Sequence, residues 1–371
     1  MMSARFLTVV LERAFNMRDG FGREIDYMRI SVIDSCNLNC YYCNPCDNNE
    51  HCHALNILSV KEVLCIVRAA TRLGIKHFRL TGGEPLLHPQ LDEMVLQIKK
   101  IPGVSSVSLT TNAVLLAQHA KWLKEAGIDS INVSLDTIDA SEYERITKKP
   151  LLEEVKHGIN AAIECGIRVK INVVLTPQTD VVALTRYVAK KGTDIRFIEM
   201  MPVGEGHTNG VEPYKKVIGT LSKLYGEPCR INTEKTKEIN SGNDKRKIPD
   251  NGPAEYYIFP ELGIRVGLIQ AIHGKFCATC NRIRVTADGR LMPCLGSSVT
   301  MDLVPDSCEF TDDVEKDFVI VQALKAAIKA KPRCHNFNDN AVTYTKTTET
   351  KTTEIEAAEV NAARNMSRIG G

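Results

Sequence analysis

The stretch YMRISVIDSCNLNCYYC, residues 27–43, decides how the rest of the chain is interpreted. Its first half, Met28–Ile33, is a short, mostly apolar run that predicts a buried strand. Its second half places Cys36, Cys40 and Cys43 within eight residues, directly after that strand. Three thiolates at this spacing can converge on one soft metal centre. The pattern favours a four-iron cluster, in which three protein thiolates leave one iron open for another ligand.

Two other interpretations of this loop remain open, namely a zinc site that lacks one ligand and ordinary buried cysteines. Cys46 and Cys52 follow closely in the sequence. Their spacing matches no ligand role, and we treat them as non-ligands.

The strand at the start of this stretch is the first of six similar runs. The predicted strands are Met28–Ile33, His77–Leu80, Ser105–Leu109, Ser130–Leu135, Arg168–Leu175 and Ile195–Met200. Amphipathic stretches separate them, and one opens with a capping box formed by Ser59 and Glu62. Repeated strand–helix–strand units predict a parallel sheet. Six units are fewer than the eight of a complete barrel, so we expect an α/β fold with an incomplete (β/α)6 TIM-like barrel.

Polar residues and glycines gather where the predicted strands end. These positions are occupied by Asp34, Thr81–Glu84, Thr110–Asn112, Ser134, Asp136 and Lys170. In barrels of this kind the carboxyl ends of the strands carry the chemistry. The alternative is that some of these residues only begin turns.

A second set of cysteines lies in the C-terminal part of the chain. Two residues lie between Cys277 and Cys280, and thirteen residues lie between Cys280 and Cys294. Three cysteines fit either a second iron–sulfur cluster or a zinc ribbon whose fourth ligand is His273 or Cys308. The spacing alone does not favour one of these over the other. The expected fold therefore includes a C-terminal cluster-binding, β-containing extension.

The overall composition narrows the function classes. The 371 residues include 47 basic and 45 acidic side chains, and a net charge of +2 argues against a general nucleic-acid binder. No apolar run approaches the ~18 residues of a membrane span. The short apolar run Phe6–Leu11 lacks a signal-peptide cleavage site, and translation starting at either Met1 or Met17 fits the sequence. We expect the 13 cysteines to lie in a reducing cytoplasm, where thiolates bind metals instead of pairing.

Taken together, these motifs resemble the radical S-adenosylmethionine superfamily. Within it the sequence closely resembles the molybdenum cofactor biosynthesis protein A family, the GTP 3',8-cyclases. The resemblance runs from about Gly22 to Lys331. It is carried by Tyr27–Val32, the cysteine loop, Arg79–Pro85, Leu109–Asn112, Ile131–Asp136, Phe276–Arg284 and Cys294.

The resemblance implies a radical enzyme with two [4Fe–4S] clusters. One would be held by Cys36, Cys40 and Cys43, and the other by Cys277, Cys280 and Cys294, which favours iron over zinc at the second site. The open iron of the first cluster binds S-adenosylmethionine, and one electron cleaves it to methionine and a 5'-deoxyadenosyl radical. The implied cofactor contacts are Tyr42, Gly83, Ser134 and Met201. At Gly83 a side chain is expected to block the methionyl group.

The resemblance also implies GTP as the substrate. The matching positions are Arg29, Arg79, Thr110, Lys170, Arg282, Ile283 and Arg284. Charged side chains suit a triphosphate, since each charge-assisted hydrogen bond is worth roughly 1.5–3 kcal/mol. The radical would remove the ribose 3'-hydrogen, and the ribose carbon would attack guanine C8. The product is (8S)-3',8-cyclo-7,8-dihydroguanosine 5'-triphosphate, the first intermediate of molybdopterin biosynthesis, which makes the enzyme a lyase.

Three parts are expected along the chain: a barrel core over 22–202, a cluster-binding domain over 203–335, and a low-complexity tail over 336–371. In the family, terminal glycines such as Gly370 and Gly371 reach into the active site. The implied partners besides GTP are a downstream cyclic pyranopterin monophosphate synthase and an electron donor such as flavodoxin or ferredoxin. The oligomeric state that we consider is a homodimer. We expect neither a nucleic acid nor a membrane as a partner.

The sequence departs from the family pattern at Ser35, Asn44 and His77, where arginine, methionine and lysine are usual. If His77 replaces a lysine that contacts phosphate, Lys76 is the residue that would compensate. Two competing functions stay open. One is a radical enzyme with an auxiliary cluster that acts on a peptide or another small molecule, and the other is a non-enzymatic zinc-binding interaction module.

Overall fold

A computed structural model describes residues 17–43, 56–203, 211–231, 252–297, 299–303, 313–335 and 337. The predictions made for Asn44, Cys46, Cys52, Cys308 and Gly370–Gly371 concern residues outside these ranges. No helix within the described ranges is long and apolar enough to cross a bilayer.

Six parallel strands form the centre of the fold, and all six were predicted. They are β1 (Tyr27–Ser31), β2 (His77–Thr81), β3 (Ser106–Thr111), β4 (Ser130–Ser134), β5 (Val169–Val174) and β6 (Asp194–Ile198). Each strand pairs in parallel with the next one along the chain, and Arg29 is level with Arg79 across β1 and β2. This sequential order is the one expected of repeated strand–helix–strand units.

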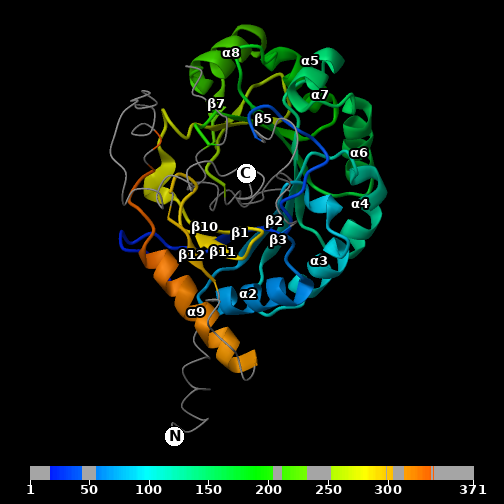
Figure 1. Ribbon diagram of the computed structural model, residues 1–371. Coiled ribbons are helices and arrows are strands. Elements are labelled where there is room, and N and C mark those ends of the chain that lie inside the picture. The colour runs from blue at the N-terminus through cyan, green and yellow to red at the C-terminus, as the bar shows by residue number, and fades with distance from the viewer. Residues whose placement is uncertain are drawn as a thin grey trace, which may run out of the picture.

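Helices connect these strands and cover their outer side. They are α2 (Val60–Arg72), α3 (Leu91–Lys99), α4 (Leu116–Glu125), α5 (Ala140–Thr147), α6 (Leu152–Glu164) and α7 (Val181–Lys190). Figure 1 shows them as an arc around the strands. The capping box before α2 is confirmed, because the Glu62 amide donates to Ser59 Oγ (3.3 Å) and the Ser59 amide donates to Glu62 Oε2 (2.8 Å).

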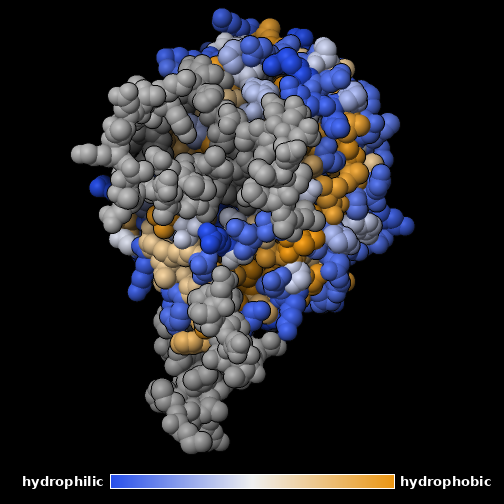
Figure 2. All heavy atoms as spheres, in the orientation of Figure 1, coloured by the Kyte–Doolittle hydropathy of each residue, from blue (hydrophilic) through white to orange (hydrophobic). Residues whose placement is uncertain are grey.

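The strands separate an apolar outer layer from a polar interior. Successive side chains of a strand point to opposite faces. On β1 and β2, Met28, Ile30 and Phe78 are fully buried in the apolar core, whereas the alternating Arg29 and Arg79 line an internal pocket. Hydrophilic residues predominate around the outer rim formed by the helices (Figure 2). The interior of this barrel is therefore suited to a polar ligand.

The C-terminal elements extend both edges of the parallel sheet. They are a π-helix (Tyr214–Ile218), α8 (Gly219–Tyr225), β7 (Cys229–Arg230), β8 (Glu255–Ile258), β9 (Arg265–Ile269), β10 (Arg282–Val285), β11 (Arg290–Met292), β12 (Met301–Asp302) and α9 (Asp313–Lys329). Strand β9 pairs in parallel with β6, and β10 pairs in parallel with β1. The strand order is β12-β11-β10-β1-β2-β3-β4-β5-β6-β9-β8-β7.

This arrangement confirms an open, incomplete barrel with a β-containing extension. One sheet runs across the boundary expected near residue 202, because β9 and β10 flank the six core strands. Helix α9 packs beside α2 (Figure 1), where Arg72 forms an ion pair with Asp317 at 3.0 Å. The C-terminal part is thus joined to the core on both edges of the sheet and on its outer side.

Candidate active site

A pocket of about 300 Å³ opens at the carboxyl ends of the strands, within the size range of small-molecule sites. Its walls come from β1 to β6, from β9 and β10, and from both sets of cysteines. Of the seventeen predicted site residues, fifteen line this pocket: Arg29, Cys36, Cys40, Tyr42, Cys43, Arg79, Gly83, Thr110, Ser134, Met201, Cys277, Cys280, Arg282, Arg284 and Cys294. The structure therefore brings together most of what the sequence pattern singled out.

The first cysteine loop is held against the helical region that follows β4. The amides of Asn39 and Tyr41 donate to the carbonyls of Thr147 and Ile146 at 3.0 and 3.1 Å. Burial raises the pKa of the Cys36 thiol to about 11. Burial also raises the pKa of Cys40, with further contributions from Cys43, Asp136 and Cys36. These thiols lie close enough to oppose one another's ionisation, so three thiolates here need the positive charge of a metal centre.

The Gly82-Gly83-Glu84 segment packs directly on the cysteine loop. The Gly83 amide donates to the Ile33 carbonyl at 2.7 Å, and the Glu84 amide donates to the Ser35 carbonyl at 2.8 Å. A Cβ atom on Gly83 would lie 2.1 Å from the Ser35 oxygen. Glycine is required here for contact between two backbone segments. Gly83 also lines the pocket, where contact with the methionyl group is the role that the family resemblance implies.

Tyr42, inside the cysteine loop, has its hydroxyl group fixed. It donates to Asp136 Oδ2 at 2.5 Å, and Asp136 Oδ1 accepts from the Val174 amide at 2.7 Å. Burial raises the pKa of Asp136 to about 6, even though both hydrogen bonds favour the carboxylate. Asp136 thereby links the cysteine loop to the ends of β4 and β5.

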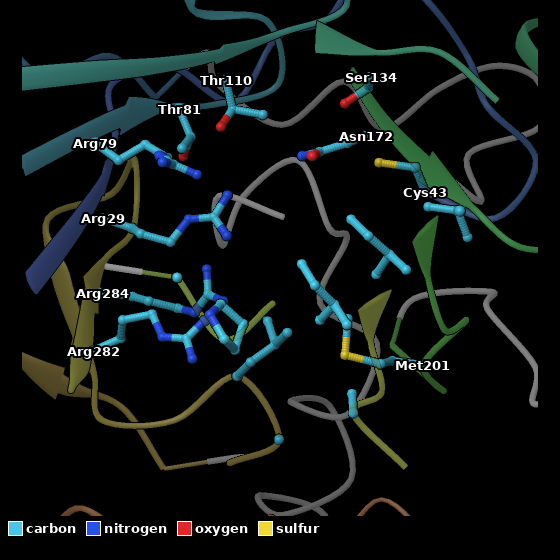
Figure 3. A pocket seen from close by; sticks show the side chains of 18 of the residues that line it. Arg29, Cys43, Arg79, Thr81, Thr110, Ser134, Asn172, Met201, Arg282 and Arg284 are labelled. Atoms are coloured by element: carbon cyan, nitrogen blue, oxygen red, sulfur yellow. The ribbon is translucent and has the colours of Figure 1, made fainter. Parts of the chain in front are cut away.

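One side of the pocket is strongly cationic. Figure 3 shows the guanidinium groups of Arg29, Arg79, Arg282 and Arg284 gathered on this side, from β1, β2 and β10. Burial lowers the pKa of Arg29 well below its ordinary value, with Arg284 and Arg79 adding to the effect. Burial and the nearby Arg282 lower the pKa of Arg284 to about 10. Such crowding of like charges is expected where an anionic ligand binds.

The opposite side of the pocket carries the residues expected at the cofactor. Ser134, Cys43 and Met201 lie across the pocket from the arginines (Figure 3). The Thr110 hydroxyl group is buried and has no hydrogen-bond partner within the described residues. The pocket thus has an anion-binding side and a side adjoining the first cysteine loop.

The second set of cysteines closes the pocket beside β10. Cys277 lies in a 3-10 turn, Phe276–Thr279, and Cys280 follows directly. Burial raises the pKa of Cys277, and the nearby Cys294 and Cys280 add to this. Burial alone would raise the pKa of Cys280, but the positive charges of Arg282 and Lys331 lower it to about 7. The thiols of this set therefore lie close enough to influence one another, and Cys280 lies beside two cations.

Two predicted GTP contacts lie outside the pocket lining. Lys170 was expected at the end of its strand, and this placement is wrong. It is the second residue of β5 and is buried, because the β-branched run after it continues the strand as far as Val174. Ile283 alternates with Arg282 and Arg284 on β10 and belongs to the apolar core.

The residues that depart from the family pattern near the phosphate side also lie outside the lining. His77 Nδ1 bonds to Ser106 Oγ at 2.8 Å, and Lys76 pairs with Asp26 at 3.7 Å. His273, which was considered as a zinc ligand, lies outside the lining as well. Its Nδ1 contacts the buried carboxylate of Glu199.

Several lining residues were not predicted. Arg196 is 2% exposed and donates to the side-chain oxygens of Asn172 and Asn132. A sequence signal for it existed, because a charged residue stands inside the otherwise apolar run 195–198. Lys331 and His335 also line the pocket, and they carried no signal, since they follow a distant helix.

Comparison with known proteins agrees with this geometry. Residues 30–183 match the model of the radical SAM superfamily, and residues 193–337 match the model called Molybdenum Cofactor Synthesis C. The GTP 3',8-cyclase of Clostridium perfringens (strain SM101) is 36% identical over 324 residues, covering 86% of this chain and 95% of that protein. The GTP 3',8-cyclase of Petrotoga mobilis is 35% identical over 331 residues, covering 87% and 96%.

The chain belongs to the GTP 3',8-cyclase family. The resemblance found in the sequence motifs is thereby confirmed. Among solved structures, Streptococcus suis SuiB bound to its precursor peptide SuiA superposes with a TM-score of 0.52 at 14% identity, over 86% of this chain and 67% of SuiB. At that identity the likeness concerns the fold alone.

Membership of the radical SAM superfamily assigns S-adenosylmethionine and an iron–sulfur cluster as cofactors. The first cysteine loop fits such a cluster, because its three cysteines are partly buried, lie close together and line the pocket. In the described part of the chain, no three His, Cys, Asp or Glu side chains are arranged for a single metal ion. The case for an iron–sulfur cluster therefore comes from the family.

Proposed function

We propose that the protein is a GTP 3',8-cyclase that uses S-adenosylmethionine and two [4Fe–4S] clusters, and is therefore a lyase. The observation that carries this proposal is the group of four arginines in a pocket lined by both cysteine sets. The positive charges of these arginines oppose one another, because Arg284, Arg79 and Arg282 all disfavour the charged form of Arg29. A triphosphate relieves that repulsion and accepts their hydrogen bonds.

On the anion-binding side, Arg29, Arg79, Arg282 and Arg284 bind the triphosphate. Charge-assisted hydrogen bonds of roughly 1.5–3 kcal/mol each are sufficient to anchor the nucleotide at this end. The Arg79 side chain is oriented by a 3.0 Å hydrogen bond from Nε to Ser108 Oγ. Thr110, whose hydroxyl group lacks a protein partner in the described structure, donates to the same ligand.

On the other side, Cys36, Cys40 and Cys43 hold the first cluster, and Ser134 and Met201 border the cofactor. Bound together, cluster and cofactor supply the one-electron chemistry that removes a hydrogen atom from the ribose. The Tyr42–Asp136 hydrogen bond fixes the cysteine loop relative to β4 and β5. The surrounding walls exclude water and hold the ribose next to the cofactor.

At the far end, Cys277, Cys280 and Cys294 hold the second cluster, which faces the guanine ring. The cyclised nucleotide then passes to a cyclic pyranopterin monophosphate synthase, and a flavodoxin or ferredoxin supplies the electron. We place the enzyme in the cytoplasm, with a homodimer as the oligomeric state to test. Lys170 and Ile283 contribute to this site only indirectly, because neither lines the pocket.

The decisive experiment is an anaerobic assay of the reduced, reconstituted protein with S-adenosylmethionine, in the presence and absence of GTP. We expect formation of 5'-deoxyadenosine that depends on GTP, together with the cyclised nucleotide as product. Cleavage of S-adenosylmethionine at the same rate without GTP would reject the cyclase function. That result would favour a radical enzyme that acts on a peptide or another small molecule.

A further inference from the structure

Two buried cations lie behind the second set of cysteines. Arg23 is 8% exposed, and its guanidinium group donates to the carbonyls of Cys277 at 2.7 Å and Pro332 at 2.6 Å. Its Nε bonds to Asp19 Oδ2 at 2.5 Å. Arg23 therefore joins the Cys277 turn to the segment after α9, and its own charge is balanced by a carboxylate.

The second cation is Lys331, which is 3% exposed. Its ammonium group donates to the Arg282 carbonyl at 2.8 Å and to the Pro293 carbonyl at 2.9 Å. Arg282 follows Cys280 by two residues, and Pro293 directly precedes Cys294. One side chain thus ties together the two chain segments that carry these cysteines, and it also lines the pocket.

The charge of Lys331 is not balanced in the way that the charge of Arg23 is. No carboxylate pairs with Lys331 in the part of the chain that the structure describes. Moving an ammonium group out of water costs several kcal/mol unless an opposite charge compensates for it. The thiol of Cys280 lies beside Lys331, and both side chains line the same pocket. Cysteines that ligate iron are thiolates, and they supply the missing negative charge.

We infer that Lys331 is a positioning residue for the second iron–sulfur cluster. It is also the buried positive charge that balances the thiolates of that cluster. The inference rests on the two-cluster function proposed above. By holding the Arg282 and Pro293 carbonyls, Lys331 fixes the separation of Cys280 and Cys294. By placing a positive charge beside the thiolates, it favours the reduced cluster, since cluster potentials depend on net charge and on hydrogen bonds to the sulfurs.

The test compares three variants of the full chain, reconstituted anaerobically with iron and sulfide. Lys331→Met removes the charge and the donors at nearly the same side-chain length, and Lys331→Arg retains both. Lys329→Met is the matched control, because Lys329 ends α9 two residues earlier and is exposed. The readouts are the midpoint potential of each cluster, followed by electron paramagnetic resonance, and the rate of iron release to a chelator. S-adenosylmethionine perturbs only the first cluster and so identifies its signal.

In Lys331→Met we expect the second cluster to shift to a more negative potential and to lose iron roughly tenfold faster or more, as is typical when a supporting residue around a metal site is removed. Lys331→Arg should recover the potential, and Lys329→Met should match the wild type. The first cluster and the circular dichroism spectrum should be unchanged in all three.

Two results overturn this inference in different ways. A wild-type protein that holds about four irons, as one cluster requires, would reject the second cluster and Lys331's role together. A wild type with two clusters, whose potential and iron-release rate are unchanged in Lys331→Met, would reject the role of Lys331 alone. If Lys331→Met unfolds, failure of Lys331→Arg to keep the wild-type potential would reject the counter-charge.

Discussion

The two cysteine sites of this protein are built in opposite ways. The first three cysteines lie within eight consecutive residues after β1. The second three come from the turn before β10 and the end of β11, and a side chain that follows α9 joins these segments. The first site is therefore local in sequence, whereas the second joins two strands' ends and a side chain that lies 38 to 49 residues further along the chain.

The buried side chains that support the two sites also differ in charge type, since one is acidic and the other is basic. Beside the first site, the buried carboxylate of Glu84 accepts from the Leu86 amide, the Thr111 hydroxyl group and the Asn112 amide. Beside the second, the buried ammonium group of Lys331 donates to two carbonyls. A cation near a cluster favours its reduced form, so we expect the second site to be the one whose potential is tuned by the protein.

The largest expected effect comes from removing one ligand at each site. Cys40→Ala should abolish cleavage of S-adenosylmethionine, because the first cluster is lost. Cys294→Ala should leave the first cluster and its response to S-adenosylmethionine intact, yet abolish formation of the cyclised nucleotide. Iron analysis and product chromatography on both variants test this. Full retained activity in Cys294→Ala would show that the second site takes no part in the reaction.

The next largest effect concerns β10, the strand by which the C-terminal part of the chain contributes to the pocket. Arg284→Gln removes a buried guanidinium group on β10 and should weaken GTP binding by roughly 10- to 150-fold, the equivalent of one charge-assisted hydrogen bond of about 1.5–3 kcal/mol. Affinity is measured by equilibrium dialysis with labelled GTP. The first cluster should be unaffected, and an unchanged affinity would mean that Arg284 does not contact the triphosphate.

The contrast between the two sites also explains what the sequence could predict. The six strands, the helix cap at Ser59 and the first cysteine loop depend on neighbours in sequence, and each was found from spacing and periodicity. Lys170 was misplaced because the end of a β-branched strand cannot be located from one polar residue within it. The polar interior of the barrel follows from the strict alternation of strand side chains, which also takes Ile283 out of the pocket.

Residues brought in from distant segments were missed for a physical reason. Lys331, His335 and Arg23 gain their meaning from carbonyls and thiols that are tens to hundreds of residues away. Nothing in the local sequence marks Arg23 and Lys331 as buried, or His335 as part of the pocket. The proposal of iron over zinc at the second site likewise rests on the family resemblance, because three cysteines at that spacing fit both.

A smaller effect tests the bracing carboxylate of the first site. Burial raises the pKa of Glu84 from 4.5 to about 7, although its hydrogen bonds act in the opposite direction. Between these values the folded protein keeps a proton that the unfolded chain releases, so stability falls as the pH rises through this range. Relative to Glu84→Gln, the wild type should lose on the order of 3 kcal/mol of unfolding free energy between pH 5 and pH 8.

Urea unfolding at several pH values, on protein prepared without iron, measures this difference. The glutamine variant retains an acceptor oxygen for the donors around Glu84 but cannot titrate. The difference in unfolding free energy between this variant and the wild type at a single pH is therefore not informative. The change of that difference with pH is the informative quantity. Parallel pH profiles for the two proteins would show that Glu84 is already ionised at pH 5.

The smallest expected effect compares the contribution of a core strand to GTP binding with the contribution of β10. Thr110→Val replaces a buried hydroxyl group that has no partner among the described residues by a methyl group of similar size. If that hydroxyl group donates to the nucleotide, its loss should raise the Kd for GTP by roughly 2- to 10-fold, the equivalent of one neutral hydrogen bond. The effect should add to that of Arg284→Gln in the double variant, because the two side chains contact the ligand from different strands. Unchanged or tighter binding in Thr110→Val would instead mean that the hydroxyl group does not contact the nucleotide, and would leave the anion site to the arginines alone.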